Sequence, residues 1–213
     1  MKKDELNKFI YISIAFSACM ALGYITYYNK VDLETFIRGV SLSITIITFF
    51  WSFYFLYGWK WWLLRKIFYR PNLNGTWQGN FVSDWGKNEG EMGDPNDFFI
   101  VIRQNFLRIH FTTYTKTFIG YSYSETLNLK KETGLKNVSY LYRKDTSQSN
   151  DDNLREGATE LRLIINEANE SKKLEGKFWT NTRTQGKISV SFLTDDHLDS
   201  FDCVINFQNG KTS

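Results

Sequence analysis

Two long stretches without a charged residue dominate the first third of the chain. They run from Phe9 to Tyr28 and from Gly39 to Trp59, and the segment Asn29 to Arg38 joins them. At about 1.5 Å per residue, a helix of roughly twenty apolar residues crosses the hydrocarbon core of a bilayer. Both stretches are apolar all round, which argues against amphipathic surface helices. The pattern predicts a transmembrane hairpin within residues 1–71, with helices at about 9–28 and 39–59.

The first stretch also fits a cleaved export signal. The segment from Phe16 to Cys19 approaches a lipoprotein cleavage site, which supports that alternative. However, the apolar run continues well past Cys19, and Asp4 and Glu5 interrupt the positive start that an export signal prefers. We therefore favour an uncleaved anchor.

Lys and Arg residues gather at the outer ends of the hairpin. Only Lys30 and Arg38 lie between the two stretches, and this asymmetry predicts that both termini and the chain beyond the second stretch are cytoplasmic. Trp59 to Tyr69 combines aromatic rings with cations, which is typical of the cytoplasmic interface. The flanking cations are Lys2, Lys3, Lys8, Lys60, Arg65, Lys66 and Arg70.

After Pro71 the pattern changes to short runs of β-branched and aromatic residues between clusters of Gly, Asn, Asp and Ser. Apolar residues alternate within several runs, as at Leu161, Leu163 and Ile165. A period of two is typical of antiparallel strands that bury one face. We predict strands near Gly75 to Ser83, Phe98 to Asn105, Leu107 to Thr113, Phe118 to Leu129, Lys136 to Lys144, Thr159 to Asn166, Lys173 to Asn181, Lys187 to Leu193 and Phe201 to Phe207.

Eight or nine strands joined mostly by short turns are enough to close a small up-and-down barrel. The predicted fold is an all-β antiparallel closed barrel of about eight strands, formed by residues 72–213 and attached to the N-terminal two-helix hairpin. A two-sheet sandwich is the alternative arrangement.

The charge of the chain is unevenly distributed. Residues up to Pro71 contain nine Lys or Arg and four Asp or Glu, whereas the rest contains 17 and 19. A protein that binds duplex DNA or RNA needs many phosphate contacts, and the acidic balance of the β-rich part argues against such a surface. The basic excess belongs with the membrane segment.

No group of residues indicates catalysis or metal binding. His110 and His197 have no metal-ligating partner at a suitable spacing, and Asp195, Asp196 and His197 fit a polar turn. The glycines within residues 86–93 lack the Lys-Ser/Thr and helix of a phosphate-binding loop. We expect a protein that is not an enzyme, with no catalytic residues, metal site or cofactor.

The β-rich part interleaves aromatic residues with cations. Aromatic rings can stack on nucleobases while guanidinium groups bind phosphate, and a small closed barrel has room for one small ligand. The same rings also fit a packed core and the same cations a solvated surface, so composition leaves both interpretations open. The residues concerned are Trp77, Tyr121, Tyr123, Tyr140, Tyr142 and Trp179 among Arg103, Arg143, Arg162, Lys177 and Arg183.

Two motifs carry a resemblance to a known family. Leu73 to Gly79 (LNGTWQG) opens the β-rich part after the two apolar stretches, and Leu174 to Ile188 (LEGKFWTNTRTQGKI) lies near the penultimate predicted strands. In this order the chain resembles the two-transmembrane, β-strand-rich effectors of bacterial cyclic-oligonucleotide-based antiphage signalling (CBASS). The resemblance covers essentially the whole chain, through architecture more than identity.

The resemblance implies a minimal eight-stranded barrel that binds a cyclic dinucleotide made by a partner nucleotidyltransferase after phage infection. Binding would drive oligomerisation and disruption of the bacterial inner membrane, so that the host cell stops growing or dies. The implied partners are therefore the cyclic dinucleotide, the lipid bilayer and further copies of the chain, without DNA or RNA. The cyclic dinucleotide would be an activating ligand and not a cofactor.

The resemblance also suggests where the ligand binds. Trp77 is expected to close the base of the barrel as a structural residue. The hydroxyl groups and arginine after Trp179 suit a phosphate, although an ordinary hairpin turn explains them equally well. Tyr121 and Tyr123 share strand parity and could stack on bases or pack together. The candidate ligand-binding residues are Tyr121, Tyr123, Arg143, Arg162, Trp179, Thr180, Thr182, Arg183 and Thr184.

Two other functions stay open at this point. A Gly-x-Trp motif also opens lipocalin-like barrels, so a membrane-anchored barrel that binds lipid or fatty acid is one alternative. A non-enzymatic membrane adaptor whose barrel binds a protein is the other. Replacement of Arg183 by Ala is expected to abolish nucleotide-triggered toxicity only under the first hypothesis.

Overall fold

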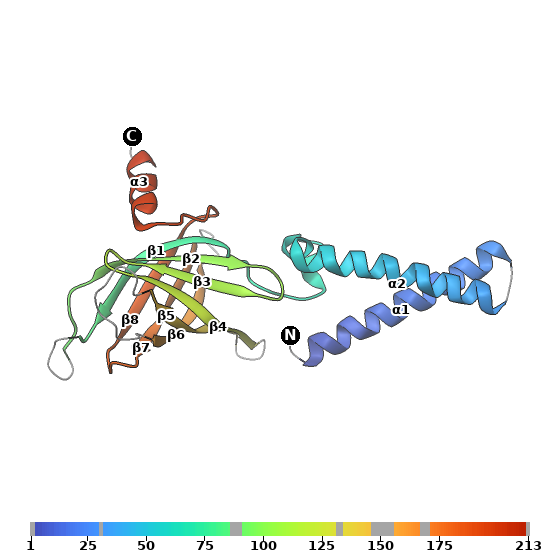
Figure 1. Ribbon diagram of the computed structural model, residues 1–213, viewed down its shortest axis with the longest axis horizontal. Helices are drawn as coiled ribbons and strands as arrows, with labels where there is room; N and C mark the ends of the chain where they lie inside the picture. The colour runs from blue at the N-terminus through green and yellow to red at the C-terminus, as the bar shows by residue number, and fades with distance from the viewer. Residues whose placement is uncertain are drawn as a thin grey trace. The chain divides into compact units, whose positions relative to one another are not determined.

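The computed structural model describes residues 3–29, 32–85, 91–130, 134–145, 156–166 and 171–211. The chain divides into two compact units, Met1–Pro71 with Asn105–Leu107, and Asn72–Gln104 with Arg108–Ser213. Figure 1 labels the α-helices and strands of both. Each unit has a hydrophobic core of its own.

The first unit contains two long antiparallel helices, α1 (Lys3–Tyr28) and α2 (Leu33–Leu56). Within them, Glu5–Tyr28 and Leu33–Leu56 are long and apolar enough to cross a membrane. The second helix begins earlier than its apolar stretch because the Asp32 side chain accepts a hydrogen bond of 2.6 Å from the backbone N–H of Thr35. Trp51 then ties the helices together, since its Nε1 donates to Ser13 Oγ at 3.0 Å.

Two short 3-10 helices, η1 (Gly58–Lys60) and η2 (Leu64–Lys66), follow α2. Here the chain forms an aromatic cluster with α2, in which Trp51, Tyr54, Trp59, Phe68 and Phe106 are buried. The Arg70 side chain lies over the ring of Phe106 at 4.3 Å and forms an ion pair of 3.1 Å with Glu5. Trp59 and Phe68 of the aromatic and basic linker therefore belong to the core of this unit, whereas Trp61 and Trp62 are exposed.

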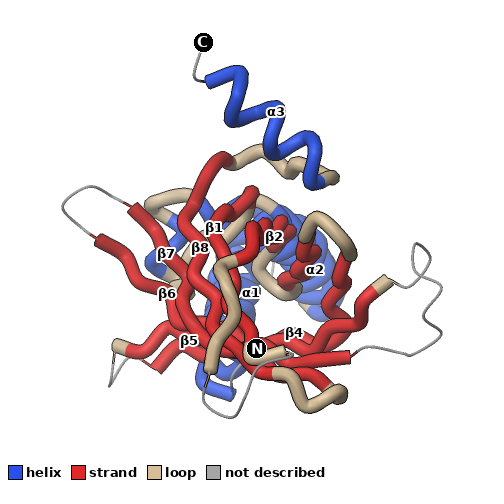
Figure 2. Tube along the Cα trace, turned by 90° about the vertical axis from the view of Figure 1, so that its left-hand side faces the viewer, coloured by secondary structure: helices blue, strands red, loops and turns tan. Residues whose placement is uncertain are grey.

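The second unit is a closed antiparallel barrel in which each strand pairs with the next and the last pairs with the first. Figure 2 shows the strands as a ring. This confirms the predicted barrel over the sandwich. The strands are β1 (Gly75–Ser83), β2 (Asn96–Gln104), β3 (Ile109–Tyr114), β4 (Ile119–Lys130), β5 (Leu135–Lys144), β6 (Glu156–Asn166), β7 (Ser171–Thr180) and β8 (Gln185–Thr194).

Large apolar side chains fill the inside of the barrel. Trp77 is fully buried, and its Nε1 donates a hydrogen bond of 2.9 Å to the carbonyl oxygen of Leu73. Phe111 and Tyr140 stack across the interior, and Phe192 meets Trp77 edge-on. The space that a lipocalin-like barrel would offer to a lipid is thus occupied by the protein's own core.

The backbone around β1 explains why the LNGTWQG motif has glycine at two positions. Gly75 has a φ of 115°, a conformation that residues other than glycine rarely adopt. A Cβ atom at Gly79 would lie 1.9 Å from the carbonyl oxygen of Ser189 on β8. Both glycines therefore let β1 bend and approach the strand that closes the barrel.

The prediction of a strand at Phe201 to Phe207 is wrong, because this segment lies in the helix α3 (Phe201–Lys211). The barrel is already closed by β8 and β1, so no free edge is left for a ninth strand. Ser200 Oγ accepts a hydrogen bond from the backbone N–H of Cys203, which caps the helix. Phe201, Val204 and Ile205 then form one helical face, and Figures 1 and 2 show α3 outside the barrel wall.

Candidate functional site

The outer wall of β5 to β8 presents polar and aromatic side chains in aligned rows. Successive strand residues point to opposite faces, so the residues between the core positions of these strands point outward. The register aligns Leu141 with Ala158, Ala158 with Trp179, and Trp179 with Gln185. The next outward row contains Ser139, Glu160, Lys177 and Lys187.

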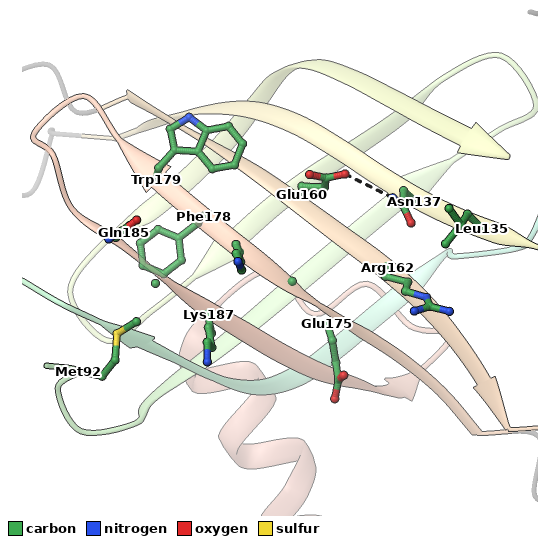
Figure 3. Close-up of a pocket in the computed structure, with 13 residues that line it drawn as sticks. Met92, Leu135, Asn137, Glu160, Arg162, Glu175, Phe178, Trp179, Gln185 and Lys187 are labelled. Atoms are coloured by element: carbon green, nitrogen blue, oxygen red, sulfur yellow. Dashed lines mark hydrogen bonds between the residues drawn. The ribbon is translucent and has the colours of Figure 1, made fainter. Parts of the chain in front are cut away.

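A groove of about 660 Å³ lies on this wall. Its volume falls within the range of about 300–1,000 Å³ found for small-molecule sites. Figure 3 shows charged, amide and aromatic side chains from β5 to β8 around it. The lining residues that matter below are Asn137, Glu160, Arg162, Lys177, Trp179 and Lys187.

The two carboxylates of the groove already have protein partners. Asn137 Nδ2 donates a hydrogen bond of 3.3 Å to Glu160 Oε1, drawn as the dashed line in Figure 3. Glu175 forms an ion pair with Lys173 at 2.5 Å. By contrast, Lys177, Lys187 and Arg162 form no ion pair with any residue in the described ranges.

Arg162 and Trp179 are the predicted site residues that the structure brings into this groove. Trp179 is 51% exposed, as are Tyr121 and Tyr123 to a similar extent, so its indole is accessible to a ligand. Arg162 lies opposite Glu175 on the neighbouring strand. These two residues provide a ring and a cation on one wall.

Thr180, Thr182, Arg183 and Thr184 form the turn between β7 and β8, directly after Trp179. The hydroxyl of Thr180 contacts the Thr182 hydroxyl at 2.9 Å and accepts a hydrogen bond from the backbone N–H of Thr184. Arg183 has a φ of 60° and an exposed side chain. The threonines thus build a tight turn that borders the groove, while the guanidinium extends from it.

Tyr121, Tyr123 and Arg143 lie on β4 and β5, outside the lining of the groove. Arg143 donates from Nε and Nη2 to Glu156 Oε1 at 3.1 and 2.8 Å, and its guanidinium lies 5.9 Å from the centre of the Tyr123 ring. Tyr121 and Tyr123 are about half exposed. Because Arg143 is already paired, it is less available to a phosphate than the cations of the groove.

Glu156 joins these residues to the turn. Its carbonyl oxygen accepts a hydrogen bond of 2.9 Å from the backbone N–H of Asn181, while its carboxylate binds Arg143. The predicted residues therefore fall into three groups: the turn, the wall groove, and the Tyr121, Tyr123 and Arg143 group. Arg162 lies farther along β6 than the others, opposite Asn137 and Glu175.

The sequence-based prediction missed Lys187, Glu160 and Asn137, and it counted Lys177 only among the cations. Apolar and polar residues alternate around Lys177 and Lys187, and this alternation predicts that both side chains point outward. Their alignment depends on the register between β7 and β8, which the alternation does not define. The available signal was the motif LEGKFWTNTRTQGKI, which contains both lysines.

Inside the barrel, the chemical environment differs sharply from that of the outer wall. Burial raises the pKa of the Tyr142 phenol to about 12. Burial also raises the pKa of the Tyr140 phenol. These phenols resist ionisation because they are buried, and the same burial would disfavour a dianionic ligand inside the barrel.

In the described part of the chain, no three His, Cys, Asp or Glu side chains come together as a possible metal site. The chemistry available on the outer wall is instead that of binding: ammonium and guanidinium groups for an anion, an open indole for a ring, and amide and carboxylate groups for polar edges.

Comparison with known proteins supports this picture. Residues 68–191 match the model of a family described as Cap15, cyclic dinucleotide receptor domain. The match begins before β1 and ends within β8, so it includes β1 to β7, most of β8 and both motifs. None of the curated proteins matches the chain.

Proposed function

The chain belongs to the family of the Cap15 cyclic dinucleotide receptor domain, and from this premise we propose that its barrel senses a cyclic dinucleotide at the outer wall. The observation that carries the proposal is the family match over β1 to β7 and most of β8. The groove supports it because it combines cations with an open indole, the groups that suit phosphate and base. A receptor domain also favours a sensor over an enzyme.

We further propose that ligand binding drives association of the chains and disruption of the membrane. The transmembrane hairpin would then hold the barrels at the cytoplasmic face of the bacterial inner membrane, with both termini in the cytoplasm. A ligand shifts such an equilibrium only if it binds the associated state more tightly than the separate chains. The partner nucleotidyltransferase of a CBASS system would supply the ligand.

The composition of the two apolar stretches favours bilayer disruption over an ion-selective pore. Between Phe9 and Tyr28 and between Gly39 and Trp59 the chain has no Asp, Glu, Lys or Arg, so no ring of charge could select ions. The helices also carry small and hydroxyl residues, which allow close helix packing in a bilayer. Among these are Ser13, Ser17, Ala21, Gly39, Ser41, Ser43 and Thr45.

The packed interior argues against the lipid-binding alternative. A fatty acid would have to displace buried rings such as Trp77 and Phe111, and core deletions of this size cost about 3–5 kcal/mol. A ligand on the outer wall needs no such rearrangement. This observation places the cyclic dinucleotide ahead of a lipid as the expected ligand.

The test uses the full chain in detergent micelles. We would record thermal unfolding with cyclic di-GMP, cyclic di-AMP, cyclic GMP-AMP, the linear dinucleotide pGpG and a fatty acid. Selective binding at one hundred times Kd stabilises the folded state by about 2.7 kcal/mol, so one cyclic dinucleotide should raise the midpoint while pGpG does not. A response to the fatty acid alone, or to nothing in the panel, would contradict the proposal.

Association and membrane disruption need their own readouts. The mass of the detergent-solubilised chain, measured by light scattering, should increase when the active cyclic dinucleotide is added. The same ligand should release a trapped dye from liposomes that contain the chain. Binding without an increase in mass or dye release would retain the sensor and refute the effector mechanism.

A further inference from the structure

Lys177 and Lys187 lie directly opposite each other on β7 and β8, and both side chains are exposed on the outer wall. Like charges in directly opposite positions of a sheet destabilise it. On its other side Lys177 is aligned with Glu160 on β6. The row of Ser139, Glu160, Lys177 and Lys187 therefore has two positive charges and one negative charge. A folded protein without an anionic ligand gains little from this placement.

The neighbouring carboxylates form no direct ion pair with either lysine in the described ranges. Glu160 accepts a hydrogen bond from Asn137, and Glu175 is paired with Lys173. In the described ranges neither Lys177 nor Lys187 has an ion-pair partner within 4.0 Å, and Arg162 adds a third cation to the groove. The groove lining therefore has three cations and two carboxylates, a net charge of +1, whereas the chain after Pro71 has more acidic than basic residues.

An aromatic ring lies next to this pair of cations. Trp179 follows Lys177 by two residues on β7, so both side chains point outward, about 7 Å apart along the strand. Its indole is 51% exposed and lines the same groove. A pair of ammonium groups beside an open ring matches a phosphate that is linked to a base.

We propose that Lys177 and Lys187 together bind one phosphate of the cyclic dinucleotide and that Trp179 stacks on the adjacent base. The subsite lies on the outer wall of the barrel and not in its lumen. This inference rests on the proposed function, because it assigns a subsite to the same ligand. Lysine acts here as a point charge for phosphate, while the indole is tolerant of base identity.

The test compares two doubly substituted full-length chains in detergent. Lys177→Gln/Lys187→Gln removes the proposed subsite. Arg108→Gln/Lys116→Gln removes the same charge from exposed positions outside the groove lining. The ligand is whichever of cyclic di-GMP, cyclic di-AMP and cyclic GMP-AMP binds the unaltered chain best, and Kd is measured by calorimetry at two salt concentrations.

We expect the groove variant to bind about tenfold to a hundredfold more weakly than the unaltered chain, because two charge-assisted contacts are lost. The control variant should keep the affinity within about twofold. The affinity of the unaltered chain should fall as salt rises, and the groove variant should lose most of this dependence. Its ligand-free thermal midpoint should not fall, because the substitution removes a repulsion.

A second variant separates the ring from the charge. Trp179→Phe keeps an aromatic face and should retain most of the affinity, whereas Trp179→Ala should lose about tenfold. If the groove variant and Trp179→Ala both bound the cyclic dinucleotide as tightly as the unaltered chain, this inference would be overturned. The proposed function would remain intact. Failure of the unaltered chain to bind any of the three cyclic dinucleotides would overturn the proposed function, and the subsite with it.

Discussion

Phe111 and Tyr140 stack face to face inside the barrel, with ring centroids 4.4 Å apart and planes inclined by 7°. One ring comes from β3 and the other from β5, so the contact crosses the interior instead of joining paired strands. Phe111 is 1% exposed and Tyr140 2%. The stack occupies space that a ligand in the lumen would need, which favours the outer wall that we propose as the binding surface.

This stack makes the interior sensitive to truncation. Phe111→Ala should lower the free energy of unfolding by about 3–5 kcal/mol, because the substitution removes a buried ring and leaves a cavity. The measurement is urea unfolding of the full chain in detergent. Tyr121→Ala provides the control, since that ring is about half exposed. A loss below about 1 kcal/mol for Phe111→Ala would contradict a rigidly packed lumen.

The buried phenol of Tyr142 predicts a specific dependence of stability on pH. Its pKa is raised from 10.0 to about 12 by burial, so between these values the unfolded chain releases a proton that the folded chain retains. The stabilising contribution is fully present below pH 10 and is lost as pH rises to about 12. The free energy of unfolding should therefore fall in this window by up to about 1.4 kcal/mol per pH unit for this group.

Unfolding of Tyr142→Phe, measured from pH 8 to 11, checks this prediction. The variant should show a shallower decline than the unaltered chain above pH 10, because it has one fewer phenol that ionises on unfolding. Replacement of the exposed Tyr121 by Phe serves as the comparison. If the Tyr142→Phe chain and the unaltered chain declined in parallel, the phenol would not be held in a dry interior.

The strands of the β-rich unit and the two apolar helices follow from the sequence alone, because each depends on a local pattern, whereas closure of the sheet into a barrel does not. Alternation at Leu161, Leu163 and Ile165 defines a strand whatever its neighbours are, and β6 contains all three residues. Length and lack of charge likewise define α1 and α2. Such patterns predict the elements correctly because the burial of one face directly determines the spacing of the apolar residues.

Other features depend on relationships that no local pattern contains. At Phe201 to Phe207 the alternating apolar residues also fit a helical spacing, and only closure of the barrel by β8 and β1 decides between the two. The alignment of Lys177 with Lys187 depends on register. From the sequence, Trp179 fits either a buried or an exposed position, because the pattern does not show which face of β7 points into the barrel. The positions of these residues could not be predicted from the sequence, because the pairing of distant strands determines their surroundings.

The helix α3 lies beyond the residues that match the family, and it covers part of the barrel wall. Val204 is fully buried against Phe99, Val101 and Tyr114. Val204→Asp would place an unpaired carboxylate among these side chains, which should detach the helix and expose an apolar surface. We expect faster proteolysis after Ser200 and a lower thermal midpoint.

The same substitution at an exposed position of the helix is the matched control. Asn206→Asp should leave both the proteolysis rate and the midpoint close to those of the unaltered chain. If Val204→Asp behaved like Asn206→Asp, α3 would not be held to the barrel by this contact.

Arg183 allows the turn between β7 and β8 to be tested without damage to its backbone. Its φ of 60° is favourable for Asn, so Arg183→Asn keeps the turn that Thr180 and Thr184 stabilise while it removes the guanidinium. If the guanidinium binds a phosphate of the ligand, affinity should fall about tenfold or more with an unchanged thermal midpoint, and nucleotide-triggered toxicity should be lost in cells. Lys116→Asn, in the exposed turn between β3 and β4, removes the same charge and should alter neither. Unchanged affinity and toxicity in Arg183→Asn would reduce the threonine-rich segment to an ordinary hairpin turn and confine the phosphate contacts to the wall groove.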